Sequence, residues 1–127
     1  MKVVVLIVRI LLGLVFLVFG LNGFLGFIPK QPLPSGLAGQ FLTVLFQSHY
    51  VLFVSAFQVA GGALLLVNRY VPLALTLLGP VIVNILLYHL LLDHAGAIGA
   101  VVVAVFWGIL ALRCRQYFSG IFVQRAS

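Results

Sequence analysis

The sequence predicts an all-α integral membrane protein: a bundle of four transmembrane helices with a short amphipathic helix between the first two spans. Two observations carry this prediction. Of the 127 residues, 65% are hydrophobic and 6% are charged, with a mean hydropathy of +1.34, whereas soluble domains are about 45–50% apolar and about 25% charged. The chain also contains four apolar runs of roughly the 20 residues that cross a bilayer; they occupy residues 3–28, 50–67, 71–92 and 95–113.

The first predicted span, residues 3–28, begins beside Lys2 and contains a second cation, Arg9. Because Arg9 interrupts the apolar run and no small-x-small cleavage site follows, we interpret this segment as a retained span rather than a signal peptide. The only acidic residue, Asp93, falls on the opposite side of the predicted membrane. Arg9 therefore has three candidate roles: it snorkels to cytoplasmic water, binds a lipid phosphate, or caps the carbonyl end of a helix.

An amphipathic helix is predicted over residues 36–47. Pro29, Pro32 and Pro34 block a regular helix just before it. Apolar and polar side chains then fall on opposite stripes at helical spacing, which is typical of a helix that lies in the membrane interface. The segment is either a connector that dips into the outer interface or a lid over an outward-facing pocket. Its apolar stripe is Leu37, Phe41, Val44 and Leu45, and its polar stripe is Gln40, Thr43 and Gln47.

Polar side chains in the second and third spans predict a pocket that opens outward. Gln58 and Asn84 lie at matched depths, roughly 12 Å below the outer boundary at ~1.5 Å per residue, so a direct hydrogen bond could join them. Pro80 is expected to kink the third span. We expect the stripe of Thr76, Pro80, Asn84 and Tyr88 to face protein or water, because acyl chains cannot satisfy its polar groups. The predicted ligand-binding residues are Asn22, Gln58, Asn84, Tyr88 and His89.

The fourth span, residues 95–113, carries a small residue at every fourth position. In lipid, small residues mark places where two helix backbones approach closely. This ridge serves either the interior of the bundle or the seam of a homodimer. Its members are Gly96, Ala100, Ala104 and Gly108.

The cations are distributed unevenly across the predicted spans. Six of the seven fall on the side that also holds both termini, and the positive-inside rule therefore predicts that both termini are cytoplasmic. These six cations are Lys2, Arg9, Arg69, Arg113, Arg115 and Arg125.

Several function classes are disfavoured by the sequence. The single cysteine, Cys114, excludes an intramolecular disulfide and a cysteine metal cage. The three histidines (His49, His89 and His94) lie near the outer face with one carboxylate among them, so we predict no metal site. No basic patch of the kind that binds nucleic acid is visible, and no buried acidic residue is available for a proton relay.

Three segments carry a family resemblance: residues 9–24 (RILLGLVFLVFGLNGF), 58–72 (QVAGGALLLVNRYVP) and 77–89 (LLGPVIVNILLYH). With them, the chain resembles the DoxX-like (DoxX/DoxD) family of small four-span bacterial membrane proteins over roughly residues 5–118. The resemblance implies a bacterial inner-membrane location. Its DoxD/DoxA relatives are associated with thiosulfate:quinone oxidoreductase activity, other members with membrane redox complexes, and the distant animal relative NACHO with assembly of nicotinic receptors. The matching positions are Arg9, Asn22, Gln58, Asn84 and His89.

The leading function expected from the sequence is a non-enzymatic accessory subunit or assembly factor. It would bind a lipid, a quinone-like molecule or a partner's membrane helix at the outward-facing pocket, with a soluble partner or a homodimer as further options. One alternative is a quinone-linked oxidoreductase subunit of the thiosulfate:quinone type, with a ring-sized slot near His89. Another is a passive lipid-binding structural protein.

Overall fold

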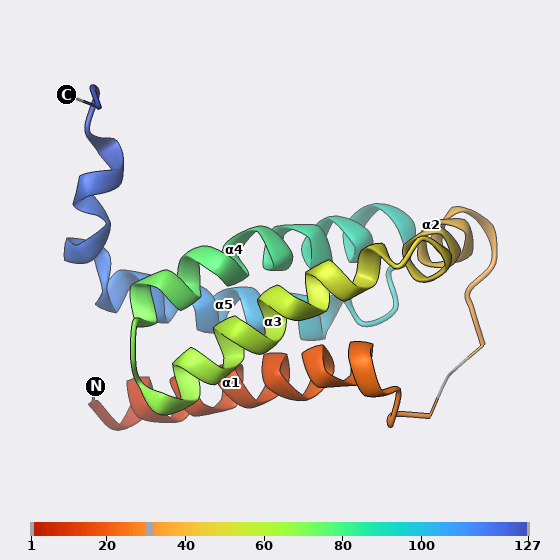
Figure 1. The fold of residues 1–127 in the computed structure, drawn as a ribbon, viewed down its shortest axis with the longest axis horizontal. Helices are drawn as coiled ribbons and strands as arrows, with labels where there is room; N and C mark the ends of the chain where they lie inside the picture. Colours follow the sequence, from red (N-terminus) through yellow and green to blue (C-terminus); the bar gives the residue numbers. More distant parts are fainter. Residues whose placement is uncertain (1, 30–31, 127) are drawn as a thin grey trace.

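The computed structural model describes residues 2–29 and 32–126, and every regular element in these two ranges is helical (Figure 1). Three helical stretches are long and apolar enough to cross a membrane: Lys2–Leu25, Tyr50–Val67 and Val71–Leu92. A fourth reaches that length only if Ala97–Arg113 is joined to Arg115–Phe122 across an 82° bend. The elements are α1 (Lys2–Leu25), α2 (Gly36–Gln47), α3 (Tyr50–Val67), α4 (Val71–Leu87), η1 (Tyr88–Leu92), α5 (Ala97–Arg113) and η2 (Arg115–Phe122).

Local sequence determines where the long helices end. The predicted first span extends to residue 28, but α1 stops at Leu25 because Gly26 adopts a φ of 63° that a regular helix cannot continue. Similarly, α5 starts at Ala97 rather than at residue 95, since Gly96 takes a φ of 83° just before it. Helix α4 continues through Pro80 and then widens into the π-helical turn η1, a feature that the apolar run at residues 71–92 does not predict.

Helices α1 and α3 approach each other closely. A Cβ added at Gly62 would lie 2.6 Å from the backbone nitrogen of Leu17, and one added at Gly20 would lie 2.8 Å from the backbone nitrogen of Val59. Such contacts leave no room for a side chain, so these glycines allow the two backbones to touch. Figure 1 shows α1 and α3 running side by side along the molecule.

The remaining long helices complete a core around this pair. Leu75 and Leu78 of α4 are fully buried, and Leu78 meets α3 at Gly61. Helix α5 is tied to α4 by a hydrogen bond of 2.9 Å from the Trp107 indole N–H to the Leu75 carbonyl. The core residues are Val8, Leu12, Phe16, Leu65, Ala74, Leu75, Leu78, Val81, Ile82 and Leu110.

The small-residue ridge predicted in the fourth span does not form one continuous contact. Ala100 is buried and Ala104 packs against the core. A Cβ added at Gly108, however, would meet no atom within 4 Å, and Gly96 lies outside the helix as its N-cap. The ridge therefore serves the interior along only part of its length.

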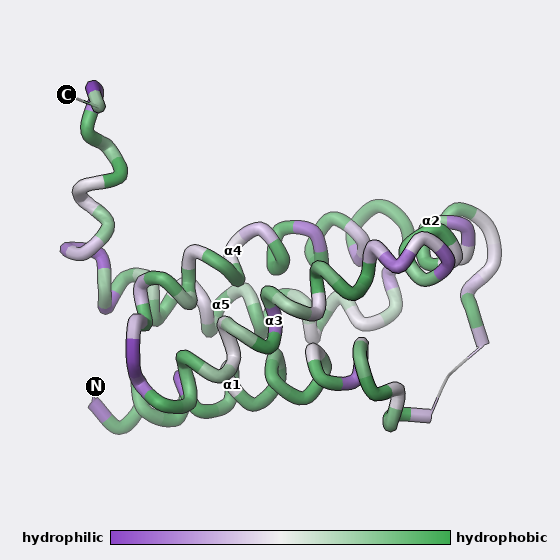
Figure 2. Tube along the Cα trace, in the orientation of Figure 1, coloured by the Kyte–Doolittle hydropathy of each residue, from purple (hydrophilic) through white to green (hydrophobic). Residues whose placement is uncertain are grey.

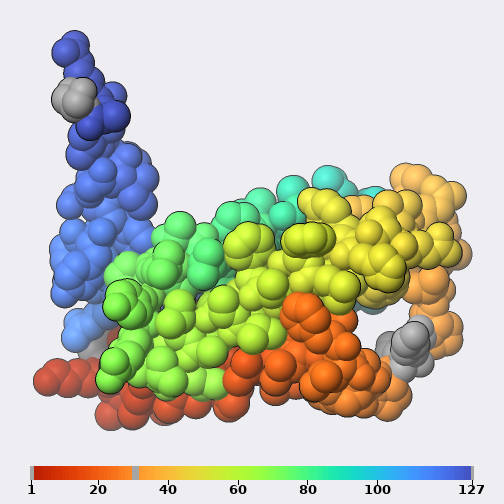
Figure 3. Space-filling view, in the orientation of Figure 1, coloured from red at the N-terminus to blue at the C-terminus, as the bar shows by residue number. Residues whose placement is uncertain are grey.

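Hydrophilic residues concentrate toward the ends of the long helices, whose middles are mostly hydrophobic (Figure 2). The N-terminus, the turn between α3 and α4 and the end of α5 share one end of the molecule (Figure 1), and α2 covers the opposite end, where it contacts α3 and η1. From the first of these ends, η2 projects away from the packed helices (Figure 3), although its Phe118 still packs against the core.

Candidate functional site

Asn22, the first predicted ligand-binding residue, closes the end of α1. Its side-chain oxygen accepts a hydrogen bond of 2.8 Å from the backbone N–H of Ile28, and its own carbonyl accepts one of 2.8 Å from Gly26. The half-buried amide therefore holds the turn that follows the helix. This capping role occupies one of the two polar atoms that a ligand would need.

The structure does not bring Gln58 and Asn84 together, and among the described residues no hydrogen bond joins them. Gln58 is half-buried beside Gly20 of α1. Asn84 is exposed, and its amide nitrogen donates a hydrogen bond of 2.9 Å to the Pro80 carbonyl within α4. The hydrogen bond that their matched depths would allow is therefore not formed.

The reason is the rotation of α4 about its own axis. Leu78 marks the side of α4 that faces α3, because it packs on Gly61. Asn84 lies six residues later, and at about 100° per residue this places it roughly 120° away from Leu78 around the helix. The stripe predicted to face protein or water is consequently turned outward: Thr76, Pro80 and Asn84 are all exposed and Tyr88 is half-buried.

Tyr88 and His89 take part in an aromatic cluster at the end covered by α2. The Tyr88 ring lies 5.8 Å from that of Phe41 in α2 and 5.1 Å, edge-on, from the His89 imidazole. The Nδ1 atom of His89 lies 3.2 Å from the Asp93 carbonyl oxygen, while the Asp93 carboxylate accepts a hydrogen bond of 3.0 Å from Ala95. The contact between Phe41 and Tyr88 attaches α2 to the π-helical turn.

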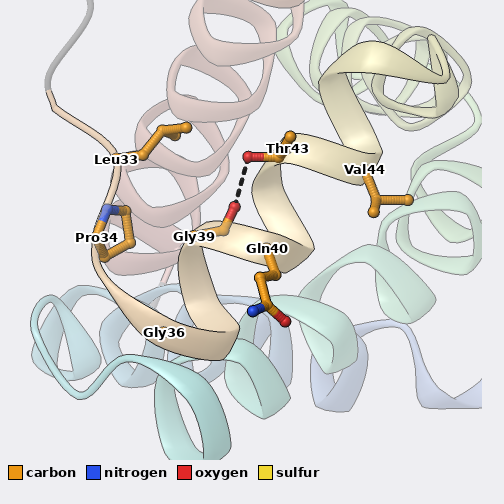
Figure 4. Close-up of a pocket in the computed structure, with 7 residues that line it drawn as sticks. All are labelled: Leu33, Pro34, Gly36, Gly39, Gln40, Thr43 and Val44. Carbon is orange, nitrogen blue, oxygen red and sulfur yellow. Dashed lines mark hydrogen bonds between the residues drawn. The ribbon is translucent and has the colours of Figure 1, made fainter.

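A shallow groove of about 460 Å³ runs along α2 (Figure 4). Leu33 and Pro34 form one wall, and the turn of α2 containing Gly39 and Thr43 forms the other, with Thr43 donating a hydrogen bond of 2.7 Å to the Gly39 carbonyl. None of the predicted ligand-binding residues lines this groove.

A second cavity of about 390 Å³ lies at the other end of the molecule, among α1, the start of α4 and the end of α5. Three cations line it: Lys2, Arg9 and Arg113. Arg9 is half-buried, and its guanidinium donates hydrogen bonds to the carbonyls of Leu65 and Leu66 in the last turn of α3. Of the three roles left open for Arg9, the structure shows the helix-cap contact.

The described residues show no cluster of metal-binding side chains. Across residues 2–29 and 32–126, no three His, Cys, Asp or Glu side chains come together in a way that would hold a metal ion. Comparison with known proteins adds no further assignment, because no family model, no curated protein and no solved structure matches this chain.

Proposed function

We propose that the chain spans a bacterial inner membrane four times, through α1, α3, the α4–η1 pair and α5, with both termini in the cytoplasm. Large apolar side chains are exposed on the surface of these helices, as expected for helices that face lipid; Ile98 is 82% exposed and Phe53 is 73% exposed. The 17 residues of α5 reach about 26 Å, near the ~30 Å of a hydrocarbon core. Helix α2, where Leu37 is 69% exposed, then lies in the outer interface.

Within that membrane, we propose that the protein is a non-enzymatic accessory subunit or assembly factor of the DoxX-like kind. Its exposed face of α4 would hold a membrane helix of a partner protein. The observation that carries this proposal is the polar character of that face. Thr76 and Asn84 each donate a hydrogen bond to a carbonyl of their own helix. Lipid offers their remaining polar atoms no partner, whereas asparagine and threonine side chains hydrogen-bond across the interfaces of packed membrane helices.

The spacing of the α4 face fits a docked helix. Five of its six exposed residues recur at intervals of three and four, which is the pattern of a coiled-coil seam, and Asn84 lies directly after one of them, Val83. Pro80 has no N–H to donate to the Thr76 carbonyl, and the Asn84 side-chain oxygen remains available beside it. Together they offer a partner helix two acceptors in the middle of hydrocarbon, where each hydrogen bond contributes about 0.6–2 kcal/mol. The face consists of Leu73, Thr76, Pro80, Val83, Asn84 and Leu87.

Site-specific photo-crosslinking in cells tests this proposal. A photoreactive phenylalanine analogue in place of Leu87, beside Asn84 on the docking face, is expected to form an adduct with one other membrane protein. That adduct should be lost in an Asn84→Leu background. The matched control is the same analogue in place of Phe19, which is 54% exposed on α1 and should form lipid adducts only.

Three results would contradict the proposal. Lipid adducts alone at both positions would leave the α4 face without a protein partner. A self-adduct at Leu87 would assign the face to a homodimer. Turnover of a quinol analogue by the purified protein, lost in His89→Phe, would favour the oxidoreductase alternative.

A further inference from the structure

The cavity at the cytoplasmic end combines positive charge with an apolar wall. Lys2, Arg9 and Arg113 line it together with the aliphatic side chains of Val5 and Leu6. On α1, the lining residues fall at positions 2, 5, 6 and 9, a spacing that places them on one face of the helix. From Lys2 to Arg9 this face extends about 10 Å, so the charged and apolar groups share one continuous hollow.

No acidic side chain lies within reach of these cations. Asp93 is the only one in the chain, and it follows η1 at the far end of the α4–η1 pair, about 33 Å along the helix from Val71 at the cavity. Three positive charges around one cavity repel each other and raise its affinity for an anion. The charge pattern therefore selects a negatively charged ligand.

Arg9 is held in position for such a ligand. Its hydrogen bonds to the Leu65 and Leu66 carbonyls fix the guanidinium against the end of α3. A guanidinium has five N–H donors and both of these bonds come from one nitrogen, so donors remain for an oxyanion. Arginine binds phosphate especially well because its planar donors match two phosphate oxygens.

We propose that this cavity binds the phosphate group of an anionic phospholipid of the cytoplasmic leaflet. Lys2, Arg9 and Arg113 surround the phosphate, and the acyl chain lies against Val5 and Leu6. The apolar wall favours a lipid over free phosphate, because an inorganic ion would leave that wall in contact with water. This inference rests on the proposed membrane placement, but not on the docking face of α4.

Native mass spectrometry of the full chain in neutral detergent tests the proposal, with phosphatidylglycerol and phosphatidylcholine as probes. The wild-type protein should retain one phosphatidylglycerol and no phosphatidylcholine. A double variant, Lys2→Gln with Arg113→Gln, should bind phosphatidylglycerol about tenfold more weakly, since two charge-assisted contacts are lost. Arg9 is left unchanged because it also caps α3.

The matched control is Arg69→Gln with Arg125→Gln, which removes the same charge from two cations that do not line the cavity. It should bind phosphatidylglycerol like the wild type. If both double variants bound phosphatidylglycerol equally weakly, the binding would depend on general surface charge and the proposal would be overturned. Unchanged binding in both double variants would also overturn it. Displacement of the lipid by millimolar inorganic phosphate would assign the cavity to a free anion and overturn the lipid assignment.

Discussion

A single arginine inside an apolar helix illustrates how a charge is accommodated where no carboxylate is available. The last carbonyls of an α-helix have no N–H partner within the helix and carry a partial negative charge. Arg9 donates to two of them, those of Leu65 and Leu66. The contact satisfies the cation and also ties α1 to the end of α3, so a residue that is costly in lipid becomes a link between two helices.

Gly96 adopts a left-handed backbone conformation that favours glycine over every other residue. We predict that Gly96→Ala lowers the free energy of unfolding by about 1–2 kcal/mol, the cost of a left-handed φ for a residue with a Cβ. The observed φ is 83°, and an added Cβ would lie 3.1 Å from the His89 ring. Denaturation in detergent, followed by the fluorescence of the only tryptophan, Trp107, measures the change.

Gly99→Ala is the control for this prediction. A Cβ at Gly99 would meet nothing within 4 Å, and the residue lies inside α5. Replacing a glycine in a helix interior should stabilise by up to about 1 kcal/mol. If both variants unfolded at the same denaturant concentration, the left-handed turn before α5 would not matter for stability.

The candidate site could be predicted only in part from the sequence. The sequence gives the depth of a residue along its membrane span, but it does not give the rotation of that helix against its neighbours. Counting residues from a span end gives the depth of Asn84 and Gln58, and both do lie in long apolar helices. Which way each amide points depends on how its helix rotates against its neighbours. For Asn84 that rotation is set by the packing of Leu78 on Gly61, a contact between two helices that no single apolar run reveals.

At the scale of elements, the seam between α1 and α3 depends on glycines in both helices. The sequence shows small residues at helical spacing in the first, second and fourth spans, and small residues alone do not say which helices pair. The structure pairs Gly20 of α1 and Gly62 of α3 with the facing backbones. The ridge in the fourth span has the more regular spacing, but at Gly108 its surface is open.

We predict that Gly62→Ala destabilises the protein by about 1–3 kcal/mol, the usual cost of inserting a methyl group into a packed interface. The clash is with the backbone of Leu17, so no side-chain rotation relieves it and the two helices must separate. The same fluorescence measurement applies. Gly79→Ala is the control, since its added Cβ would lie at an ordinary 3.5 Å from Trp107; equal stabilities for the two variants would show that the seam tolerates a methyl group.

At the scale of the whole molecule, apolar run length predicted the helices well and their ends less well. The helix over residues 36–47 has the expected bounds, and α3 coincides with the run at residues 50–67. The exceptions are local: Gly26 ends α1 early and Gly96 delays α5. Such ends depend on left-handed backbone conformations, which hydropathy does not record.

The proposed orientation of the molecule in the membrane can be tested with its own cysteine. Cys114 directly follows α5, at the end that we place in the cytoplasm. A membrane-impermeant maleimide should therefore label it in inside-out vesicles and not in intact spheroplasts. A Cys114→Ser variant gives the background, and labelling of spheroplasts would reverse the orientation.

The pH dependence of this labelling follows from the surroundings of the thiol. Burial raises the pKa of Cys114 above its ordinary value, and the positive charge of Arg113 opposes this only in part. Because the thiolate is the reactive form, a raised pKa leaves less of it at neutral pH. The labelling rate should rise about tenfold for each pH unit below that pKa. A rate in inside-out vesicles that is already pH-independent near neutrality would show that the pKa of Cys114 is lowered rather than raised, and would contradict this prediction.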